Sequence, residues 1–166
     1  MNALAEERFL VLLDEHKRIL YKVANAYCRD RDERQDLIQE ITVQLWRSFD
    51  RFDDRHRFST WMYRVAMNVA ISLYRGDRRR IHTTLPIEDF ALELAAADQI
   101  TEASDDMRLV QRLIQQLDAM NRALILLYLD GYTHDEIADI VGITTTNVAT
   151  RVNRIKQRLR REFDAA

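Results

Sequence analysis

The sequence predicts an all-α protein of two small helical domains, at residues 1–80 and 107–166, joined by a flexible acidic linker at 81–106. Apolar residues recur at intervals of three, four and seven through both outer segments, which is the period of an amphipathic helix. One Pro and three Gly among 166 residues, with 47% hydrophobic residues, also favour a helical core. The linker contains the single Pro and seven carboxylates but no Lys or Arg, so its composition differs from both neighbours.

Three amphipathic helices are expected in the first domain, at about residues 5–28, 32–49 and 59–75, with Ser59 as the candidate N-cap of the third. The outer face of the second helix is acidic and polar, with Glu33, Asp36, Gln39, Glu40 and Gln44. The inward face of the third is expected to contain Phe58, Trp61, Val65, Val69 and Leu73. A charged loop without glycine joins these two helices.

Two further helices begin the second domain, one from an N-cap at Ser104 to about residue 117 and one at about 121–129. The inward residues expected for the first are Met107, Val110, Leu113, Ile114 and Leu117. In the linker, an Ala-rich patch at 95–97 predicts one short additional helix. Asp130 and Gly131 then form a turn.

Residues 133–156 have the pattern of a helix, a tight turn and a second helix that binds DNA. Thr133 and Glu136 form a capping box, and Gly142 ends the first helix where a left-handed residue is needed. Thr144 caps the second helix, whose inward residues are Val148, Val152, Ile155 and Leu159. Its opposite face carries Asn147, Thr150, Arg151, Arg154 and Arg158. An apolar face on one side and hydrogen-bond donors on the other are typical of a helix that enters the major groove.

The third helix of the first domain carries more aromatic and basic residues than a buried scaffold needs. Its rings are interleaved with arginines and one amide: Arg55, Arg57, Phe58, Trp61, Tyr63, Arg64, Asn68, Tyr74 and Arg75. Such interleaving suits single-stranded nucleic acid, because rings stack on unpaired bases while guanidinium groups neutralise phosphates. Phe58 and Trp61 also fit the apolar stripe of a core helix, and periodicity alone favours that role for them.

No catalytic site, cofactor or metal is expected. The four His residues are scattered, Cys28 is the single cysteine, and no Gly-rich phosphate loop is present. No apolar run approaches the roughly 20 residues of a membrane span, and the N-terminus lacks the basic start of a secretory signal. A lone cysteine fits a reducing compartment, so we expect a cytoplasmic protein without membrane insertion.

Two other classes of protein share part of this pattern. A stand-alone helix-turn-helix regulator would bind duplex DNA without further subunits, usually on a palindrome. A helical interaction protein would use its basic helix only as a solvated face, and any DNA binding would then depend little on salt. The net charge of -2 does not exclude binding to nucleic acid, because the negative charge is concentrated in the linker.

Two blocks of sequence resemble the extracytoplasmic-function sigma factors, the smallest class of the bacterial sigma family. The first block is Asp36-Leu37-Ile38-Gln39-Glu40 with Trp46, then the run from Phe58 to Asn68 and the arginines 78–80. The second block runs from Gly131-Tyr132-Thr133 through Glu136-Ile137-Ala138 to Gly142-Ile143, followed by Val148 and Arg151. Many helix-turn-helix proteins share the second block, but both blocks in this order are specific.

The resemblance implies that residues 1–80 are region 2 and residues 107–166 are region 4 of a sigma factor, which is not an enzyme. Core RNA polymerase would bind at Asp36, Gln39, Glu40, Gln44 and Trp46. The -10 element would be opened and held by Arg57, Phe58, Trp61, Arg64, Asn68 and Arg75. The -35 element would be read by Thr133, Thr145, Thr146, Asn147, Thr150, Arg151, Arg154 and Arg158. The resemblance also implies an anti-sigma protein as an inhibitory partner, beside promoter DNA and polymerase.

Two positions depart from the family pattern. The loop at 53–57 is charged where the family commonly has small residues or glycine, which affects the expected capture of a -10 base. Ala149 stands where the family often has Lys. Because a methyl group can contact thymine, the -35 preference is expected to differ.

Overall fold

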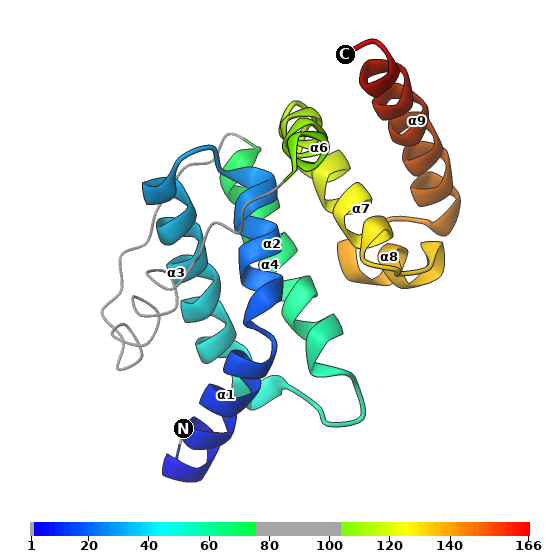
Figure 1. Cartoon of the computed structure of the whole chain (residues 1–166). Helices are drawn as coiled ribbons and strands as arrows, with labels where there is room; N and C mark the ends of the chain where they lie inside the picture. The colour runs from blue at the N-terminus through cyan, green and yellow to red at the C-terminus, as the bar shows by residue number, and fades with distance from the viewer. Residues whose placement is uncertain (1, 76–103) are drawn as a thin grey trace.

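The computed structural model describes residues 2–75 and 104–166, and all regular structure in these two ranges is helical (Figure 1). The elements are α1 (Ala3–Glu15), α2 (Lys17–Tyr27), α3 (Arg31–Ser48), the 3-10 turn η1 (Phe49–Arg51), α4 (Phe58–Tyr74), α6 (Asp105–Gln115), α7 (Ala119–Leu129), α8 (His134–Val141) and α9 (Thr145–Asp164). This confirms the all-α class with two helical units. The predicted short helix at 95–97 and arginines 78–80 lie outside the described residues.

Side-chain caps explain where most helices begin. In each case a side-chain oxygen accepts the backbone N–H three residues later, which satisfies a donor that the helix leaves unpaired. The capping residues are Asn2, Asp30, Ser104, Asp118, Thr133 and Thr144. The predicted caps at Ser104, Thr133 and Thr144 are therefore confirmed. The predicted cap at Ser59 is wrong, because α4 begins at Phe58 and the N-cap position is held by Arg57 without a side-chain bond.

The single helix predicted at 5–28 is in fact two helices. His16 has φ -112° and ψ 12°, and its backbone N–H bonds to the carbonyls of Leu12 and Asp14, which ends α1. The His16 Nδ1 atom also lies 2.9 Å from the Leu12 oxygen. The break turns α1 so that Phe9 packs edge-on against Trp46, with ring centroids 5.4 Å apart. An apolar stripe gives the helical period but does not show such a local turn.

The inward face predicted for α4 is also corrected. Of the predicted residues only Phe58 is buried, while Trp61, Val65, Val69 and Leu73 are half-buried. The buried set is Phe58, Met62, Tyr63, Ala66, Met67, Ala70 and Ile71. The reason is that α4 packs against α2 and α3 on one side and against α7 and α8 on the other. A central helix buries a broader arc than the single stripe that periodicity identifies.

Val110, Leu113 and Ile114 of α6, and Leu117 just after its end, are half-buried or buried as predicted, but Met107 is 63% exposed. Met107 lies in the first turn of α6, ahead of the buried part of that helix. Its position on the apolar stripe was therefore not enough to place it in the core.

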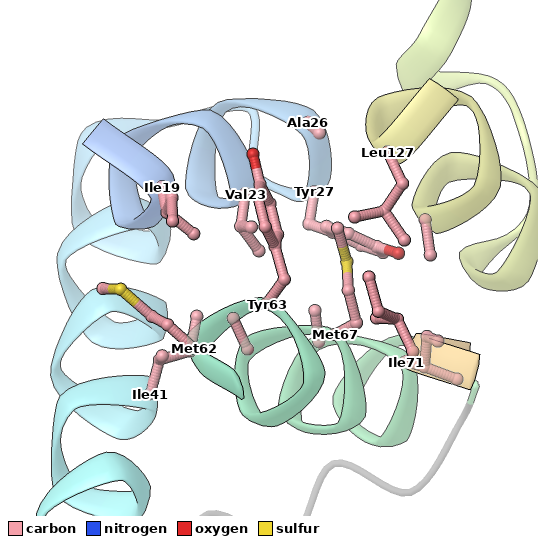
Figure 2. Packing of buried hydrophobic residues seen from close by; sticks show 14 of the residues in the cluster. Ile19, Val23, Ala26, Tyr27, Ile41, Met62, Tyr63, Met67, Ile71 and Leu127 are labelled. Atoms are coloured by element: carbon pink, nitrogen blue, oxygen red, sulfur yellow. The ribbon is translucent and has the colours of Figure 1, made fainter. Parts of the chain in front are cut away.

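The two helical units share one continuous core. Helix α7 packs against α2 and α4, and Figure 2 shows Leu127 of α7 pointing toward Tyr27 of α2, with Met67 and Ile71 of α4 beside them. All four of these side chains are buried. The sequence predicted two separate domains and gave no signal for this packing.

Candidate nucleic-acid and polymerase-binding surfaces

The helix-turn-helix is fixed by bonds at both of its helix starts. Thr133 Oγ1 accepts the Glu136 N–H at 3.2 Å, and the Glu136 carboxylate accepts the Thr133 N–H at 3.4 Å. Thr144 Oγ1 accepts the Asn147 N–H at 3.1 Å. Between these caps Gly142 has φ +77°, the left-handed conformation that glycine adopts without strain. The capping box and the glycine turn are thus as predicted.

Helix α9 is held at a fixed angle on α8. The Thr145 hydroxyl donates to Asp135 Oδ1 at 2.8 Å, which joins the first turns of the two helices. On the inner side of α9, Val148, Val152 and Ile155 are at most 4% exposed. With its inner face packed in this way, α9 can present its outer face as a rigid surface.

The outer face of α9 carries most of the predicted -35 residues. The exposed members are Thr145, Thr146, Asn147, Thr150, Arg154 and Arg158, while Thr133 lies in the cap of α8. Arg158 forms an ion pair with Glu162 at 2.9 Å. Arg151 is the exception because it is half-buried, and its guanidinium donates to Asn147 Oδ1 at 3.0 Å and to Asn121 Oδ1 at 3.4 Å.

The polar -10 residues form a stripe along α4. Arg57, Arg64, Asn68 and Arg75 are all exposed, and they are separated by seven, four and seven residues. These intervals place them on one side of the helix. Trp61 lies on the same side, four residues after Arg57, so the structure brings one aromatic ring and four polar groups to a single face.

Aromatic rings pack around the start of α4. The Trp61 ring lies 5.2 Å from Phe52, 5.4 Å from Phe58 and 6.2 Å from Phe49 between centroids. Trp61 is half-buried, whereas Phe58 is 6% exposed and is the more deeply buried of the two rings. Periodicity favoured a core role for both rings, and burial supports that role for Phe58 in this arrangement. Phe49 and Phe52 belong to the same group, and the sequence did not indicate that their rings meet the start of α4.

Ion pairs order the charged loop that precedes α4. Asp53 accepts the backbone N–H of Arg55 at 3.0 Å and its guanidinium at 2.8 Å, while Asp54 pairs with Arg8 of α1. The two bonds from Arg55 lower the pKa of the Asp53 carboxyl below its usual value. These contacts join the loop to itself and to α1.

The predicted polymerase-binding residues lie along α3. Asp36 is exposed, Gln39, Glu40 and Gln44 are half-buried, and Trp46 is half-buried against Phe9. The Gln44 amide donates to Glu40 Oε1 at 3.2 Å. Glu40 and Gln44 also line a groove of about 520 Å³ between α3 and α4, together with Asn68 of the α4 stripe.

Several polar contacts between the two units were missed by sequence reasoning. Asp130 accepts the Tyr63 hydroxyl at 2.6 Å and pairs with Lys22 at 2.5 Å. The Tyr27 hydroxyl donates to the Ala119 carbonyl at 2.6 Å. Burial, and then Asp130, raise the pKa of Tyr63 above its usual value, so it remains a neutral donor. The partners lie 67 to 108 residues apart in the chain, and no local pattern indicates such pairs.

The described residues hold neither a metal-binding cluster nor a membrane-spanning helix. Residues 2–75 and 104–166 contain no group of three His, Cys, Asp or Glu side chains placed to hold a metal ion. In the same ranges no helix is both long and apolar enough to cross a membrane.

The fold and its surfaces define a two-part helical protein with a helix-turn-helix at its C-terminal end. Residues 12–80 match the family described as Sigma-70 region 2, and residues 107–159 match Sigma-70, region 4. The chain belongs to the extracytoplasmic-function sigma factors of the sigma-70 family. Its function is promoter-directed transcription initiation, and its partners are RNA polymerase and promoter DNA.

Two named sigma factors are similar in sequence to this chain over nearly its whole length. The chain is 26% identical to the ECF RNA polymerase sigma factor SigX of Bacillus subtilis, over 96% of this chain and 85% of SigX. It is also 26% identical to the RNA polymerase sigma factor CnrH of Cupriavidus metallidurans, over 96% of this chain and 88% of CnrH.

Solved structures of two sigma factors share the fold. CnrH in complex with the cytosolic domain of CnrY has a TM-score of 0.66 at 25% identity, covering 96% of this chain and 90% of CnrH. RpoE from Bartonella quintana in complex with the anti-sigma factor NepR has a TM-score of 0.65 at 18% identity, covering 96% of both chains.

Proposed function

We propose that α9 reads the -35 element, that the α4 stripe holds the opened -10 strand, and that the outer face of α3 binds core polymerase. The observation that carries this assignment is the presence of two exposed arginine-containing helix faces, one in each unit. Each face combines side chains that can contact bases with side chains that can contact phosphates. In nucleic-acid recognition, phosphate contacts position the protein and base contacts give specificity. Residues 1–80 then act as region 2 and residues 107–166 as region 4.

On the -35 side, Thr146, Asn147 and Thr150 stand in the first turns of α9, where a recognition helix meets base edges. Arg154 and Arg158, one and two turns later, are placed for phosphates or guanine. Thr133 and Thr145 lie at the starts of α8 and α9, where hydroxyl and N–H groups bind phosphate oxygens.

On the -10 side, Trp61 offers a half-buried ring, and Arg57, Arg64 and Arg75 supply positive charge along the path of a strand. Stacking on a ring is worth about 1–3 kcal/mol per base and stabilises an unpaired strand. Asn68 can bond a base edge. Opening of the promoter then follows from preferential binding of the open state, without covalent chemistry by this chain.

The protein is proposed to act in the cytoplasm and to be held inactive by an anti-sigma protein. Both structural relatives named above were solved with a partner: one with the cytosolic domain of CnrY and one with the anti-sigma factor NepR. We expect such an inhibitor to cover the α3 surface from Asp36 to Trp46 and the face of region 4. A chain that drives transcription equally with and without every co-expressed candidate inhibitor would contradict this part.

The experiment that tests the proposal is co-elution of the purified chain with core RNA polymerase, followed by transcription from a promoter library. A stoichiometric complex and promoter-specific transcripts are expected. Glu40→Lys should abolish complex formation with an unchanged circular dichroism spectrum, whereas Glu7→Lys, an exposed change on α1, should have no effect. Retained complex formation by Glu40→Lys would refute the docking surface, and duplex binding without polymerase binding would favour a stand-alone regulator.

A further inference from the structure

Arg151 of α9 joins two amide side chains that belong to different helices. Its Nε atom donates to Asn147 Oδ1 at 3.0 Å, and its Nη1 atom donates to Asn121 Oδ1 at 3.4 Å. Asn147 lies one turn before Arg151 on α9, whereas Asn121 lies in the first turn of α7. Because the donors of a guanidinium form a rigid planar fork, these two acceptors together fix its place on the protein.

The Asn121 amide is itself held in one orientation. Its backbone N–H and its Nδ2 group donate to the two carboxylate oxygens of Asp118, the N-cap of α7, at 2.8 Å and 3.2 Å. An amide side chain has one acceptor end and one donor end. Since the donor end of Asn121 is bound to Asp118, its acceptor end is turned toward Arg151, and the first turn of α7 thereby positions the guanidinium.

The same chain of bonds orients the amide of Asn147, which is exposed on the outer face of α9. Its backbone N–H is bound by Thr144 Oγ1 at 3.1 Å, and its Oδ1 atom accepts from Arg151. Its Nδ2 group forms no hydrogen bond within residues 2–75 and 104–166. The amino end of this amide is therefore the end that remains for DNA, because the oxygen end is turned along the helix toward Arg151.

An amide in this orientation distinguishes the base edges of the major groove. Asparagine pairs with adenine through both ends, since it donates to N7 and accepts from N6. With the oxygen turned to Arg151, the N6 donor of adenine would face the amino group without an acceptor. Guanine offers the acceptors N7 and O6, thymine offers O4, and cytosine offers only a donor. The arrangement therefore favours guanine or thymine over adenine and cytosine at the contacted base.

We propose that Asn121 of α7 is a positioning residue for -35 specificity: by holding Arg151, it keeps the Asn147 amino group turned toward the DNA, which selects guanine or thymine there. The inference rests on the proposed reading of the -35 element by α9. It adds a half-buried residue outside the helix-turn-helix to those that determine promoter choice. It also gives Arg151 a second role, as the group that orients a neighbouring reader.

The test measures transcription by the reconstituted holoenzyme from a promoter library in which every -35 and -10 position carries all four bases. Asn147→Ala identifies the contacted base pair. At that pair the preference should fall roughly two- to tenfold, as expected for the loss of one hydrogen bond. Preferences at -10 should not change, and they serve as an internal control in the same experiment.

Asn121→Ala and Arg151→Ala should then shift the preference at this same base pair toward adenine, on the strand that carries the preferred guanine or thymine. Freed from Arg151, the Asn147 amide can present both of its ends, so adenine should gain roughly two- to tenfold relative to the wild-type base. Asn121→Asp should keep the wild-type preference, because a carboxylate presents an acceptor to Arg151 in either orientation. Asn25→Ala, the same truncation at a half-buried position on α2, is the matched control and should leave all preferences unchanged.

The inference would be overturned if neither Asn121→Ala nor Arg151→Ala changed the preference at the base pair that Asn147→Ala identifies. Arg151→Ala keeps this test decisive if Asn121→Ala does not fold. An equal shift in Asn121→Asp would also overturn it, since the acceptor at this position would then be irrelevant, as would an equal shift in Asn25→Ala. No change at any -35 base in Asn147→Ala would refute the inference together with the reading role of that residue. A library without any -35 preference would instead refute the reading of this element by α9.

Discussion

Substitutions of Arg151 and Arg154, in the middle of α9, are expected to distinguish an effect on DNA binding from an effect on folding. Arg154 is exposed and forms no hydrogen bond or ion pair within the described residues 2–75 and 104–166. Arg151 is half-buried and donates to Asn147 and to Asn121 of α7. Replacing each by Ala therefore removes the same charge from the same helix but different contacts within the protein.

The expected magnitudes follow from these contacts. Arg154→Ala should weaken promoter binding by about 1–3 kcal/mol if it contacts a base edge, or reduce the salt slope by roughly 0.9 if it contacts a phosphate. Its effect on folding should stay within about 0.5 kcal/mol, as for other exposed positions. Arg151→Ala should also lower the free energy of unfolding, by on the order of 1 kcal/mol, because it leaves two amide acceptors without their donor.

Promoter binding by the reconstituted holoenzyme is measured by fluorescence anisotropy at several salt concentrations. Urea unfolding of the free chain is measured in parallel. Arg160→Ala, which removes an exposed charge from α9 outside the proposed reading set, serves as the control. Full promoter affinity and an unchanged salt slope for Arg154→Ala would refute its role in reading DNA. An unchanged urea midpoint for Arg151→Ala would refute the structural role of its bonds.

Three further outcomes are expected. Gly142→Ala should destabilise the chain by about 1 kcal/mol in urea unfolding, because its φ of +77° is unfavourable for Ala although a new Cβ would meet nothing within 4 Å; a loss above about 3 kcal/mol would indicate a clash instead. Ile137→Ala, at a fully buried position, should cost about 2–5 kcal/mol and abolish -35 binding before the far-ultraviolet signal of region 2 is lost. Cys28 should react with iodoacetamide slowly at pH 8 and faster only as the pH approaches 11 or after unfolding, since burial raises its thiol pKa to about 11; rapid alkylation of the folded chain at pH 8 would contradict its burial.

Helix starts could be predicted from the sequence because their causes are local. A capping box needs two residues three apart, and a left-handed turn needs one glycine, so Thr133, Glu136 and Gly142 were sufficient to locate α8 and its end. The same holds for the outer face of α9, where a helix buried on one side leaves its polar residues exposed.

The face of α4 and the packing of the two units could not be predicted in this way. Tyr63 and Met67 lie off the apolar stripe that periodicity identified, because their burial depends on α7 and α8, which are distant in the chain. Tyr63 also looked like a candidate partner of nucleic acid, whereas its hydroxyl is bonded to Asp130. Contacts of this kind depend on tertiary structure, which overrides local pattern.

The packing of the two units on each other has a consequence for building chimeric sigma factors. The exposed residues of α9 can be exchanged one at a time, because the caps and the Asp135–Thr145 bond hold the helix-turn-helix independently of them. Exchanging region 4 as a whole also replaces Leu127 and Asp130, which are shaped for region 2 of this chain. A transplanted region 4 should therefore bring a new promoter preference together with a changed fit against α2 and α4, so promoter choice and the stability of the whole chain would change together.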